Sequence, residues 1–374
     1  MYSKLGVRKA ISCRGTYTDL GGSIVDPRVI DVMKEASRTH VLMEELHVKA
    51  GKYVAELLGV EAAFITTGAA GGLLLATAAL IAGNDPARMS RLPCTAGMKN
   101  EVLICKCQRF AFDHPVRAAG GRFVEFGHGT DTAPWEMEAA INERTAYGLW
   151  LPAQNSYAAL PFEVFRDIAK SRGVPVVVDC AGETPPVDNL TRYSKLGADL
   201  VVISGGKGIR GPQSTGLVVG KKELVNACRA NSSPNLFIGR PLKVGKEEIC
   251  GLVAALEIYL NETSITERDL WEKMVGHIVD RLRGIPGVEV RRHFPYQPTR
   301  HVPIIVIRLE EESGLSTAEV FRKLAEKDPP IYAYAPGGFG YQRGRGFILN
   351  PHTMLEGEEY VVAERLREVL TRAA

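Results

Sequence analysis

The sequence predicts an α/β fold, in which a mostly parallel sheet lies between helices, together with a smaller α+β domain towards the C-terminus. Strand-like and helical segments alternate through the middle of the chain, as in proteins that build parallel sheets. Two of the strand-like segments, VPVVVD (174–179) and LVVIS (200–204), are nearly continuous apolar runs, which is typical of strands buried on both faces. We expect an N-terminal segment and large domain at residues 1–250 and a small domain at residues 251–374.

The individual elements follow from the spacing of apolar residues and from the glycines and prolines between them. The large domain is expected to have a helical region at 27–58 and helices at 73–83, 114–121, 135–144, 161–173 and 190–198. Its strands are expected at 62–66, 101–106, 122–127, 146–152, 174–179, 199–208 and 215–220. Residues 246–284 read as mostly helical, and the C-terminal part is expected to hold strands at 288–294, 302–310 and 332–336 and helices at 317–327 and 357–370.

Composition places the chain among soluble globular proteins. Its 374 residues are 45% hydrophobic and 24% charged, which excludes a disordered, collagen-like or coiled-coil chain. The formal net charge of +3 gives no electrostatic reason to expect nucleic-acid binding. The uncharged stretch 62–84 contains several glycines and threonines and is expected to be a strand and a buried helix rather than a membrane span.

The cysteines and the N-terminus bear on the cellular compartment. The seven cysteines are an odd number in a long chain, which does not favour a disulfide framework. Cys105 and Cys107 form a C-x-C pair without a second pair at the spacing of a zinc site, so we expect no metal site. The first residues contain no apolar signal segment, and we expect a reduced, cytoplasmic protein.

Residues that suit a cofactor follow several of the expected strands. In open α/β sheets, ligands bind beyond the carboxyl ends of the strands. The turn Thr67-Gly68-Ala69 opens a helix, whose free N–H groups suit a phosphate, although a tight turn made for packing is an equal alternative. Lys207 follows an apolar strand and two glycines and is a candidate to form a Schiff base, whereas a lone lysine of this kind is more often a surface residue.

Asp179 adds specificity to the lysine. It ends the strand before the one that leads to Lys207, and a βαβ unit places both strand ends at the same edge of the sheet. A carboxylate there can keep a pyridine nitrogen protonated, although a single aspartate after a strand is more often a loop or helix-capping residue. Asp179, Ser204, Lys207 and the phosphate-binding turn together point to pyridoxal phosphate far more specifically than any one of them.

Several longer motifs resemble a known family. The chain resembles the pyridoxal-phosphate enzymes with the aspartate-aminotransferase-like fold. Within that fold it is similar to the family of bacterial selenocysteine synthase (seryl-tRNA selenium transferase) and D-glucosaminate-6-phosphate ammonia-lyase. The motifs that carry the resemblance span nearly the whole chain and are TDLGGS (18–23), EAAFITTGAAGG (61–72), VPVVVDCAGE (174–183), SGGKGIRGPQSTG (204–216), GRPLKVGKEE (239–248) and LNPHTMLEGEE (349–359).

The resemblance implies a role for each matching residue. Lys207 would carry the cofactor as a Schiff base and later act as acid and base, and Asp179 would pair with the pyridine nitrogen. The other implied contacts hold the remaining groups of the cofactor. The phosphate would be bound by Thr67, Gly68, Ala69 and Ser204, and the ring hydroxyl would be approached by Asn155. One face of the ring would pack against Ala181, and the other would be covered by one residue of the segment containing Gln108 and Phe110. Gln213 and Arg240 are implied to reach the site of a neighbouring subunit, so that a homo-oligomer with shared active sites is expected.

Arginine side chains suit the carboxylate of a substrate, and we name Arg210 and Arg240 as candidates. The expected reaction is an α,β-elimination of the ammonia-lyase type on a small, hydroxylated or phosphorylated amino acid. Alternatives that the residues leave open are a seryl-tRNA selenium or sulfur transferase, an aldolase, a racemase, an aminotransferase, and a regulatory relative without activity. The selenocysteine synthases carry a tRNA-binding domain ahead of the catalytic part, whereas the motifs here begin close to Met1, so we expect a small-molecule substrate rather than tRNA.

Overall fold

The chain forms two compact units, each described here by itself. The structure is a computed structural model, and it describes residues 1–152, 157–262, 266–335 and 345–371. The large unit is Val25–Asn261, and the small unit combines Met1–Ile24 with Glu262–Ala374.

This division differs from the expected one at two places. The N-terminal residues belong to the small unit because β1 (Ile11–Ser12) pairs in parallel with β11 (Ile331–Tyr332). The boundary near residue 250 lies further along the chain, because helix α10 (Lys246–Glu262) is continuous and its buried face joins the core of the large unit. Strand pairing over more than 300 residues leaves no local signal in the sequence, which is why the first difference was not predicted.

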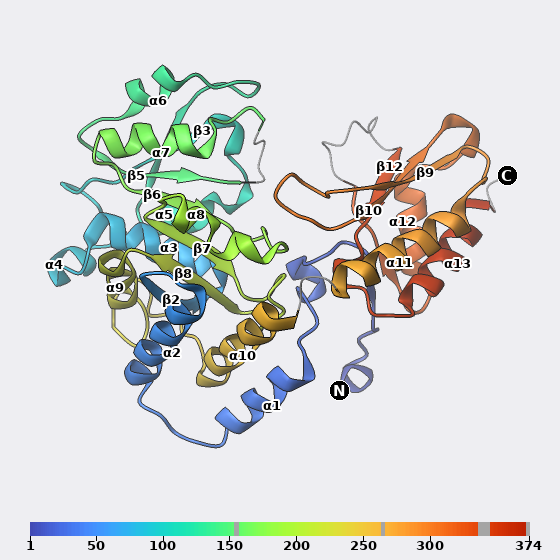
Figure 1. Cartoon of the computed structure of the whole chain (residues 1–374), viewed down its shortest axis with the longest axis horizontal. Helices are drawn as coiled ribbons and strands as arrows, with labels where there is room; N and C mark the ends of the chain where they lie inside the picture. Colours follow the sequence, from blue (N-terminus) through green and yellow to red (C-terminus); the bar gives the residue numbers. More distant parts are fainter. Residues whose placement is uncertain (153–156, 263–265, 336–344, 372–374) are drawn as a thin grey trace. The chain divides into compact units, whose positions relative to one another are not determined.

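A seven-stranded sheet forms the centre of the large unit (Figure 1). Its order is β2-β8-β7-β6-β5-β3-β4, and only β8 runs antiparallel to its neighbours, so the predicted mostly parallel sheet is confirmed. The seven strands, all at predicted places, are β2 (Ala62–Thr67), β3 (Glu101–Cys105), β4 (Arg122–Phe126), β5 (Thr145–Trp150), β6 (Val176–Asp179), β7 (Leu200–Ser204) and β8 (Thr215–Gly220).

Helices cover both faces of this sheet, because successive residues of its strands, which point to opposite faces, are apolar. In β6, for example, Val177 contributes to one hydrophobic core and Val176 and Val178 contribute to the other. The first face carries α3 (Gly68–Ala82), α5 (His114–Ala118) and α9 (Lys222–Asn231). The second carries α2 (Met43–Leu58), α6 (Pro134–Ala140), α7 (Phe162–Ser171), α8 (Arg192–Lys195) and α10.

The expected helical region 27–58 is two helices, α1 (Pro27–Ala36) and α2. The uncharged stretch that begins at residue 62 forms β2 and α3, as predicted, and α3 is buried along most of its length. None of the helices in the described part of the chain combines the length and the apolar character needed to cross a membrane. The short α4 (Pro86–Met89) follows α3 and is capped by Asp85.

The small unit contains a three-stranded antiparallel sheet in the order β12-β10-β9. Its strands are β9 (Val288–His293), β10 (Ile304–Leu309) and β12 (Gly346–Leu349), and its helices are α11 (Thr266–Leu282), α12 (Thr317–Glu326) and α13 (Glu358–Thr371). The strand expected at 332–336 is shorter and lies earlier, as β11, while β12 was not predicted. β12 is a four-residue run between a glycine-rich segment and a proline, and its pairing with β10 is what makes it a strand.

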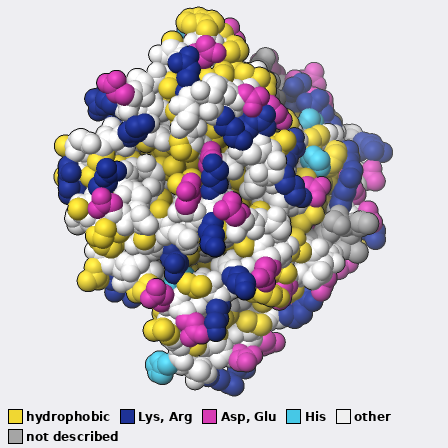
Figure 2. All heavy atoms as spheres, turned by 60° about the vertical axis from the view of Figure 1, so that its left-hand side comes forward, with side chains coloured by type: hydrophobic (Ala, Val, Ile, Leu, Met, Phe, Trp, Pro, Cys, Tyr) yellow, Lys and Arg dark blue, Asp and Glu magenta, His cyan; other side chains and the backbone are white. Residues whose placement is uncertain are grey.

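Charged side chains are distributed evenly over the face that Figure 2 shows. Basic and acidic groups alternate there among polar and apolar side chains, in line with a formal net charge of only +3. On the described residues of this face there is no extended area of one charge of the kind that binds a nucleic-acid backbone.

A buried histidine lies between α2 and the sheet. His47 is 6% exposed, and its ring centroid is 5.2 Å from that of Phe64 on β2. Its Nδ1 atom is buried and has no hydrogen-bond partner among the described residues. Burial, and then the charge of Arg229, lower the pKa of His47 below its usual value. The neutral imidazole is therefore the form that fits this core.

We predict that His47 makes the large unit sensitive to mild acid. Because the folded chain binds this proton more weakly than the unfolded chain does, stability falls as the pH drops below about 6.5. The substitution His47→Leu is expected to remove this pH dependence. Between pH 7 and about pH 5.5, the free energy of unfolding of the variant should fall by about 1 kcal/mol less than that of the wild type. Thermal unfolding midpoints over this pH range measure the difference. His40→Leu, which replaces an exposed histidine, is the control. Parallel losses in wild type and His47→Leu would contradict the prediction.

Candidate active site

The carboxyl ends of neighbouring strands bring the predicted site residues together on the large unit. Strands β2 and β7 end at Thr67 and Ser204, and both flank β8, which begins at the same edge because it runs antiparallel. The register pairs Thr67 with Thr215 and Ser204 with Gly216. Asp179 ends β6 on the other side of β7, opposite Val202. The sheet therefore places the turn at the start of α3, the Asp179 carboxylate and the lysine loop at neighbouring strand ends.

Helix α3 begins at this edge without a side-chain cap. The Thr67 hydroxyl donates to the carbonyl oxygen of Leu242 at 2.8 Å, and the Thr66 hydroxyl donates to that of Gly68 at 2.9 Å. Both threonines are thus directed away from the first N–H groups of the helix. Gly68 has φ +64°, and a Cβ atom at its position would meet no atom within 4 Å. Uncapped N–H groups at the positive end of a 15-residue helix, beside open space, suit a phosphate group.

The start of α3 lies tightly against β8. A Cβ atom at Gly216 would lie 2.7 Å from the carbonyl oxygen of Gly68 and 2.8 Å from the nitrogen of Ala69. Only glycine allows this approach, because real Cβ atoms do not come so close to backbone atoms. Sequence reasoning did not identify Gly216 as a site residue, although it ends the SGGKGIRGPQSTG motif.

Lys207 stands on a loop that closes on itself between β7 and β8. The N–H of Gly205 donates to the carbonyl of Thr215 at 2.8 Å, and the N–H of Gly211 donates back to the carbonyl of Gly205 at 2.9 Å. The hydroxyl of Thr215 donates to the carbonyl of Pro212 at 2.6 Å. Lys207 itself is half-buried. These bonds hold the backbone on both sides of the lysine, so that its side chain starts from a defined position.

Neighbouring elements support this loop. A Cβ atom at Gly208 would lie 2.6 Å from the carbonyl oxygen of Thr184, which places the loop in contact with the segment that follows Asp179. Leu252 of α10 packs against Gly205 and Gly211, and Glu248 at the start of the same helix accepts a hydrogen bond from the Ser214 hydroxyl. The sequence contained no signal for the role of α10, because its contacts with the loop depend on the packing of distant elements.

Arg210 follows the lysine in a strained conformation. Its φ of +58° is the only positive value of a non-glycine residue among those described. Its N–H donates to the carbonyl of Lys207 at 2.9 Å. Its charge, after the hydrogen bond and charge of Arg28, contributes to lowering the pKa of Asp26, which places its guanidinium near the start of α1. Backbone strain of this kind concentrates at functional sites.

Asp179 is buried, with 9% of its surface exposed. Its Oδ1 atom accepts a hydrogen bond of 3.0 Å from the N–H of Ala181, which orients the carboxylate. Ser204 is also buried, and Ala181 is half-buried. A buried, oriented carboxylate of this kind suits a positively charged partner such as a protonated pyridine nitrogen.

Gln108 links the ends of β3 and β5. It is fully buried, its Nε2 donates to the carbonyl of Leu151 at 2.6 Å, and its Oε1 has no hydrogen-bond partner among the described residues. Phe110 is half-buried, with its ring centroid 5.2 Å from that of Phe112. Asn155, predicted to approach the ring hydroxyl, lies outside the described residues. The unsatisfied oxygen at this sheet edge is one more polar group that a bound molecule can satisfy.

Two predicted residues lie on the surface of the large unit. Gln213 and Arg240 are exposed, and their predicted roles towards a neighbouring subunit stay predictions. Among the described residues, no group of three or more His, Cys, Asp or Glu side chains is placed to hold a metal ion.

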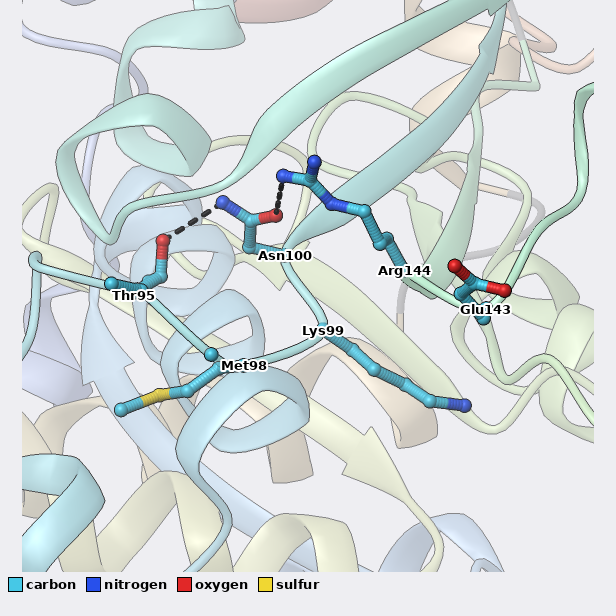
Figure 3. A pocket seen from close by; sticks show the side chains of 8 residues that line it. Thr95, Met98, Lys99, Asn100, Glu143 and Arg144 are labelled. Carbon is cyan, nitrogen blue, oxygen red and sulfur yellow. Dashed lines mark hydrogen bonds between the residues drawn. The ribbon is translucent and has the colours of Figure 1, made fainter.

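A cavity of about 490 Å³ lies at the opposite, amino edge of the sheet. It is lined by Thr95–Asn100, which precede β3, and by Glu143 and Arg144, which precede β5. Figure 3 shows Asn100 between two of these side chains: its Nδ2 donates to the Thr95 hydroxyl at 2.8 Å, and its Oδ1 accepts from Arg144 at 3.5 Å. None of the predicted site residues lines this cavity.

The described residues fit a phosphate-bearing pyridine cofactor at the carboxyl edge. The uncapped N–H groups at the start of α3 can bind the phosphate, and the buried carboxylate of Asp179 can pair with the ring nitrogen. Lys207 offers an amine on a hydrogen-bonded loop. Each lies at a strand end next to the others in the sheet order β2-β8-β7-β6.

Comparisons with known proteins identify similar enzymes. The chain is 33% identical to the D-glucosaminate-6-phosphate ammonia lyase of Salmonella typhimurium, over 100% of this chain and 99% of the relative. It is 32% identical to the 5'-C-glycyluridine monooxygenase-decarboxylase of a Streptomyces species, over 99% and 92%. The L-seryl-tRNA(Sec) selenium transferase of Aquifex aeolicus is 23% identical, over 88% of this chain and 78% of the relative.

Solved structures show the same fold. A structure of D-glucosaminate-6-phosphate ammonia-lyase has a TM-score of 0.84 at 31% identity and covers 100% of this chain and 98% of its own. The serine palmitoyltransferase of Sphingomonas wittichii has a TM-score of 0.62 at 13% identity, covers 98% and 88%, and shows the fold alone. The family model of L-seryl-tRNA selenium transferase matches residues 17–284. The chain therefore belongs to the L-seryl-tRNA selenium transferase (SelA) family of pyridoxal-phosphate enzymes.

Proposed function

We propose that the protein is a lyase that eliminates water and then ammonia from a small 2-amino-3-hydroxy acid, of which D-glucosaminate 6-phosphate is the first to test. The observation that carries the proposal is the placement of Lys207, Asp179 and the start of α3 at adjacent strand ends. The substrate class is supported by the similarity, over the full length of both chains, to an ammonia lyase of that name.

The residues of the carboxyl edge have separate tasks in holding the cofactor. The N–H groups at the start of α3, with Thr67 and Ser204 close by, bind its phosphate, and Asp179 keeps its ring nitrogen protonated. Lys207 anchors it covalently through its Nζ atom. When bound, pyridoxal phosphate supplies an electron sink for the bond electrons released at the substrate α-carbon.

Lys207 is also the base of the reaction. With its Nζ atom released by an incoming substrate amine, Lys207 would be free to accept the proton from the substrate α-carbon. It then returns this proton to the β-hydroxyl, which leaves as water while a double bond forms between the α- and β-carbons. The Lys207 amine would then displace the dehydrated product, which leaves as an enamine. Hydrolysis of this free enamine takes up water and releases ammonia, so that the net products are a 2-oxo-3-deoxy acid and ammonia. Arg210, held near Lys207 by its strained backbone, binds the substrate carboxylate in this scheme.

A second candidate is an oxygen-dependent decarboxylation of an amino acid. It is supported by the similarity to the Streptomyces monooxygenase-decarboxylase, which is 32% identical over nearly the whole chain. The two candidates differ in products: the lyase releases ammonia and an oxo acid without oxygen, whereas the decarboxylase consumes oxygen and releases carbon dioxide. Activity that is unchanged under anaerobic conditions would favour the lyase.

We predict that Lys207→Ala removes both the covalent anchor and the base. In the wild type, borohydride reduction is expected to fix the cofactor on the peptide that contains Lys207, as peptide mapping by mass spectrometry measures. The variant should lose this adduct and at least about 10³-fold in oxo-acid release from D-glucosaminate 6-phosphate. Lys195→Ala, at an exposed lysine of the same unit, is the control and should behave like the wild type. An adduct on another lysine would contradict the assignment.

We further predict that Gly216→Ala weakens cofactor binding. The added methyl group would collide with the backbone of Gly68 and Ala69 and displace the start of α3. The dissociation constant of pyridoxal phosphate should rise about tenfold or more, since a charge-assisted contact to phosphate is worth about 1.5–3 kcal/mol. Absorbance titration of the cofactor-free protein measures it. Gly276→Ala, where a Cβ atom meets nothing within 4 Å, is the matched control. Equal affinity of the two variants for pyridoxal phosphate would contradict the proposed role of the start of α3.

A further inference from the structure

A cluster of arginine and tyrosine side chains in the small unit has no task in the chemistry above. It joins three segments that are far apart in the sequence: Arg14 and Tyr17 after β1, residues 296–300 between β9 and β10, and Tyr334 after β11. Backbone bridges hold each segment, between Arg14 and Asn350, between Gln297 and Arg300, and between Tyr334 and Ile348.

Arg14, Tyr17 and Tyr334 form the centre of the cluster. The guanidinium carbon of Arg14 lies 4.7 Å from the ring centroid of Tyr17, and the rings of Tyr17 and Tyr334 are 5.2 Å apart. The hydroxyls of these two tyrosines share a hydrogen bond, and the charge of Arg300 acts on both Tyr17 and Tyr296. Two positive groups and three phenol rings thus lie together, most of them partly buried.

The tyrosines are neutral hydrogen-bond donors. Burial, followed for Tyr17 by its hydrogen bond with Tyr334, raises the pKa of Tyr17, and burial raises that of Tyr296. Because one hydrogen bond uses one hydroxyl hydrogen, the Tyr17–Tyr334 pair keeps the other hydrogen for a further acceptor.

Two polar atoms of the cluster are buried without a partner among the described residues. They are Nε of Arg14, a donor, and Oε1 of Gln297, an acceptor. Within the described ranges, Arg14 pairs with the acidic side chain of Asp19, which binds its Nη1 atom and not its Nε. Burying an unsatisfied donor or acceptor destabilises the fold, and a ligand with complementary groups would remove this cost.

We propose that this cluster is a binding site for the oxyanion of a hydroxylated organic acid, in which Arg14, Arg300 and the tyrosine hydroxyls bind a carboxylate or phosphate and Gln297 accepts a hydrogen bond from a ligand hydroxyl. Arginine suits both oxyanions, because its planar donors match two oxygens at once. This inference goes beyond the proposed reaction, because it concerns residues of the small unit alone. It does not depend on which reaction this protein catalyses.

Calorimetric titration of the cofactor-loaded protein tests the site, with three ligands that carry no amine and therefore undergo no reaction. D-gluconate offers the carboxylate, D-glucitol 6-phosphate offers the phosphate, and D-gluconate 6-phosphate offers both. Loading the cofactor occupies the start of α3 and keeps phosphate from binding there. We expect saturable binding of at least one ligand, and the pair of single-anion ligands identifies which oxyanion the cluster takes.

Substitutions locate the binding. Arg14→Gln and Arg300→Gln should each weaken it about tenfold or more, and Tyr17→Phe should weaken it less while keeping the ring contacts. Arg322→Gln, at an arginine of α12 paired only with Glu326 in the described structure, is the control and should not change it. If Arg14→Gln lowers the unfolding midpoint, Arg300→Gln and Tyr17→Phe decide the question. The absence of saturable binding by all three ligands, or equal affinity in wild type, Arg300→Gln and Tyr17→Phe, would overturn the site.

Discussion

The antiparallel placement of β8 between β2 and β7 is the constraint on which the candidate active site depends. A parallel strand there would begin at the other edge of the sheet, and the loop from β7 would have to cross the whole sheet. Because β8 reverses direction, ten residues suffice to join Ser204 to Thr215, with the lysine among them. The same reversal sets Gly216 beside the start of α3, so one strand positions both the amine and the phosphate-binding turn.

The glycines of the lysine loop allow neighbouring segments to pack closely against its backbone, rather than making the loop flexible. Gly205, Gly206 and Gly208 each leave no room for a Cβ atom, because Thr215, Gln213 and Thr184 lie against them. The loop is therefore packed on several sides, and its internal hydrogen bonds add to this. A rigid backbone of this kind favours precise placement of the Lys207 amine, since the four-carbon side chain of lysine is itself flexible.

The two units carry different kinds of polar chemistry. In the large unit the polar groups stand at strand ends and are oriented by the backbone, as the Ala181 N–H orients Asp179. In the small unit the arginine and tyrosine cluster is built from side chains on three separate segments and is stabilised by ring contacts. The second arrangement depends entirely on how β1, β11 and the hairpin between β9 and β10 come together, because none of these segments is informative alone.

Local patterns were sufficient to predict all seven strands of the large sheet. Apolar runs such as VPVVVD are typical of strands that are buried on both faces, so they can be recognised without knowledge of their partners. Strand order and direction within that sheet, the pairing of β1 with β11, and the short β12 were outside such reasoning. They arise from contacts between residues far apart in the chain, which no window of neighbouring residues contains.

The sequence by itself determined the fold class and the cofactor chemistry, and it predicts Lys207 and Asp179 as the central site residues, because strand ends and family motifs lie in continuous stretches of the chain. Only the tertiary structure decided which groups contact the predicted site residues. The Leu242 carbonyl accepts the hydrogen bond of Thr67, and the Leu151 carbonyl accepts that of Gln108. Helix α10 packs against the lysine loop. It also decided that Arg14 and Tyr17 lie against Tyr334. The physical reason is the same in each case: a side chain's chemistry is local, whereas its partner is chosen by packing.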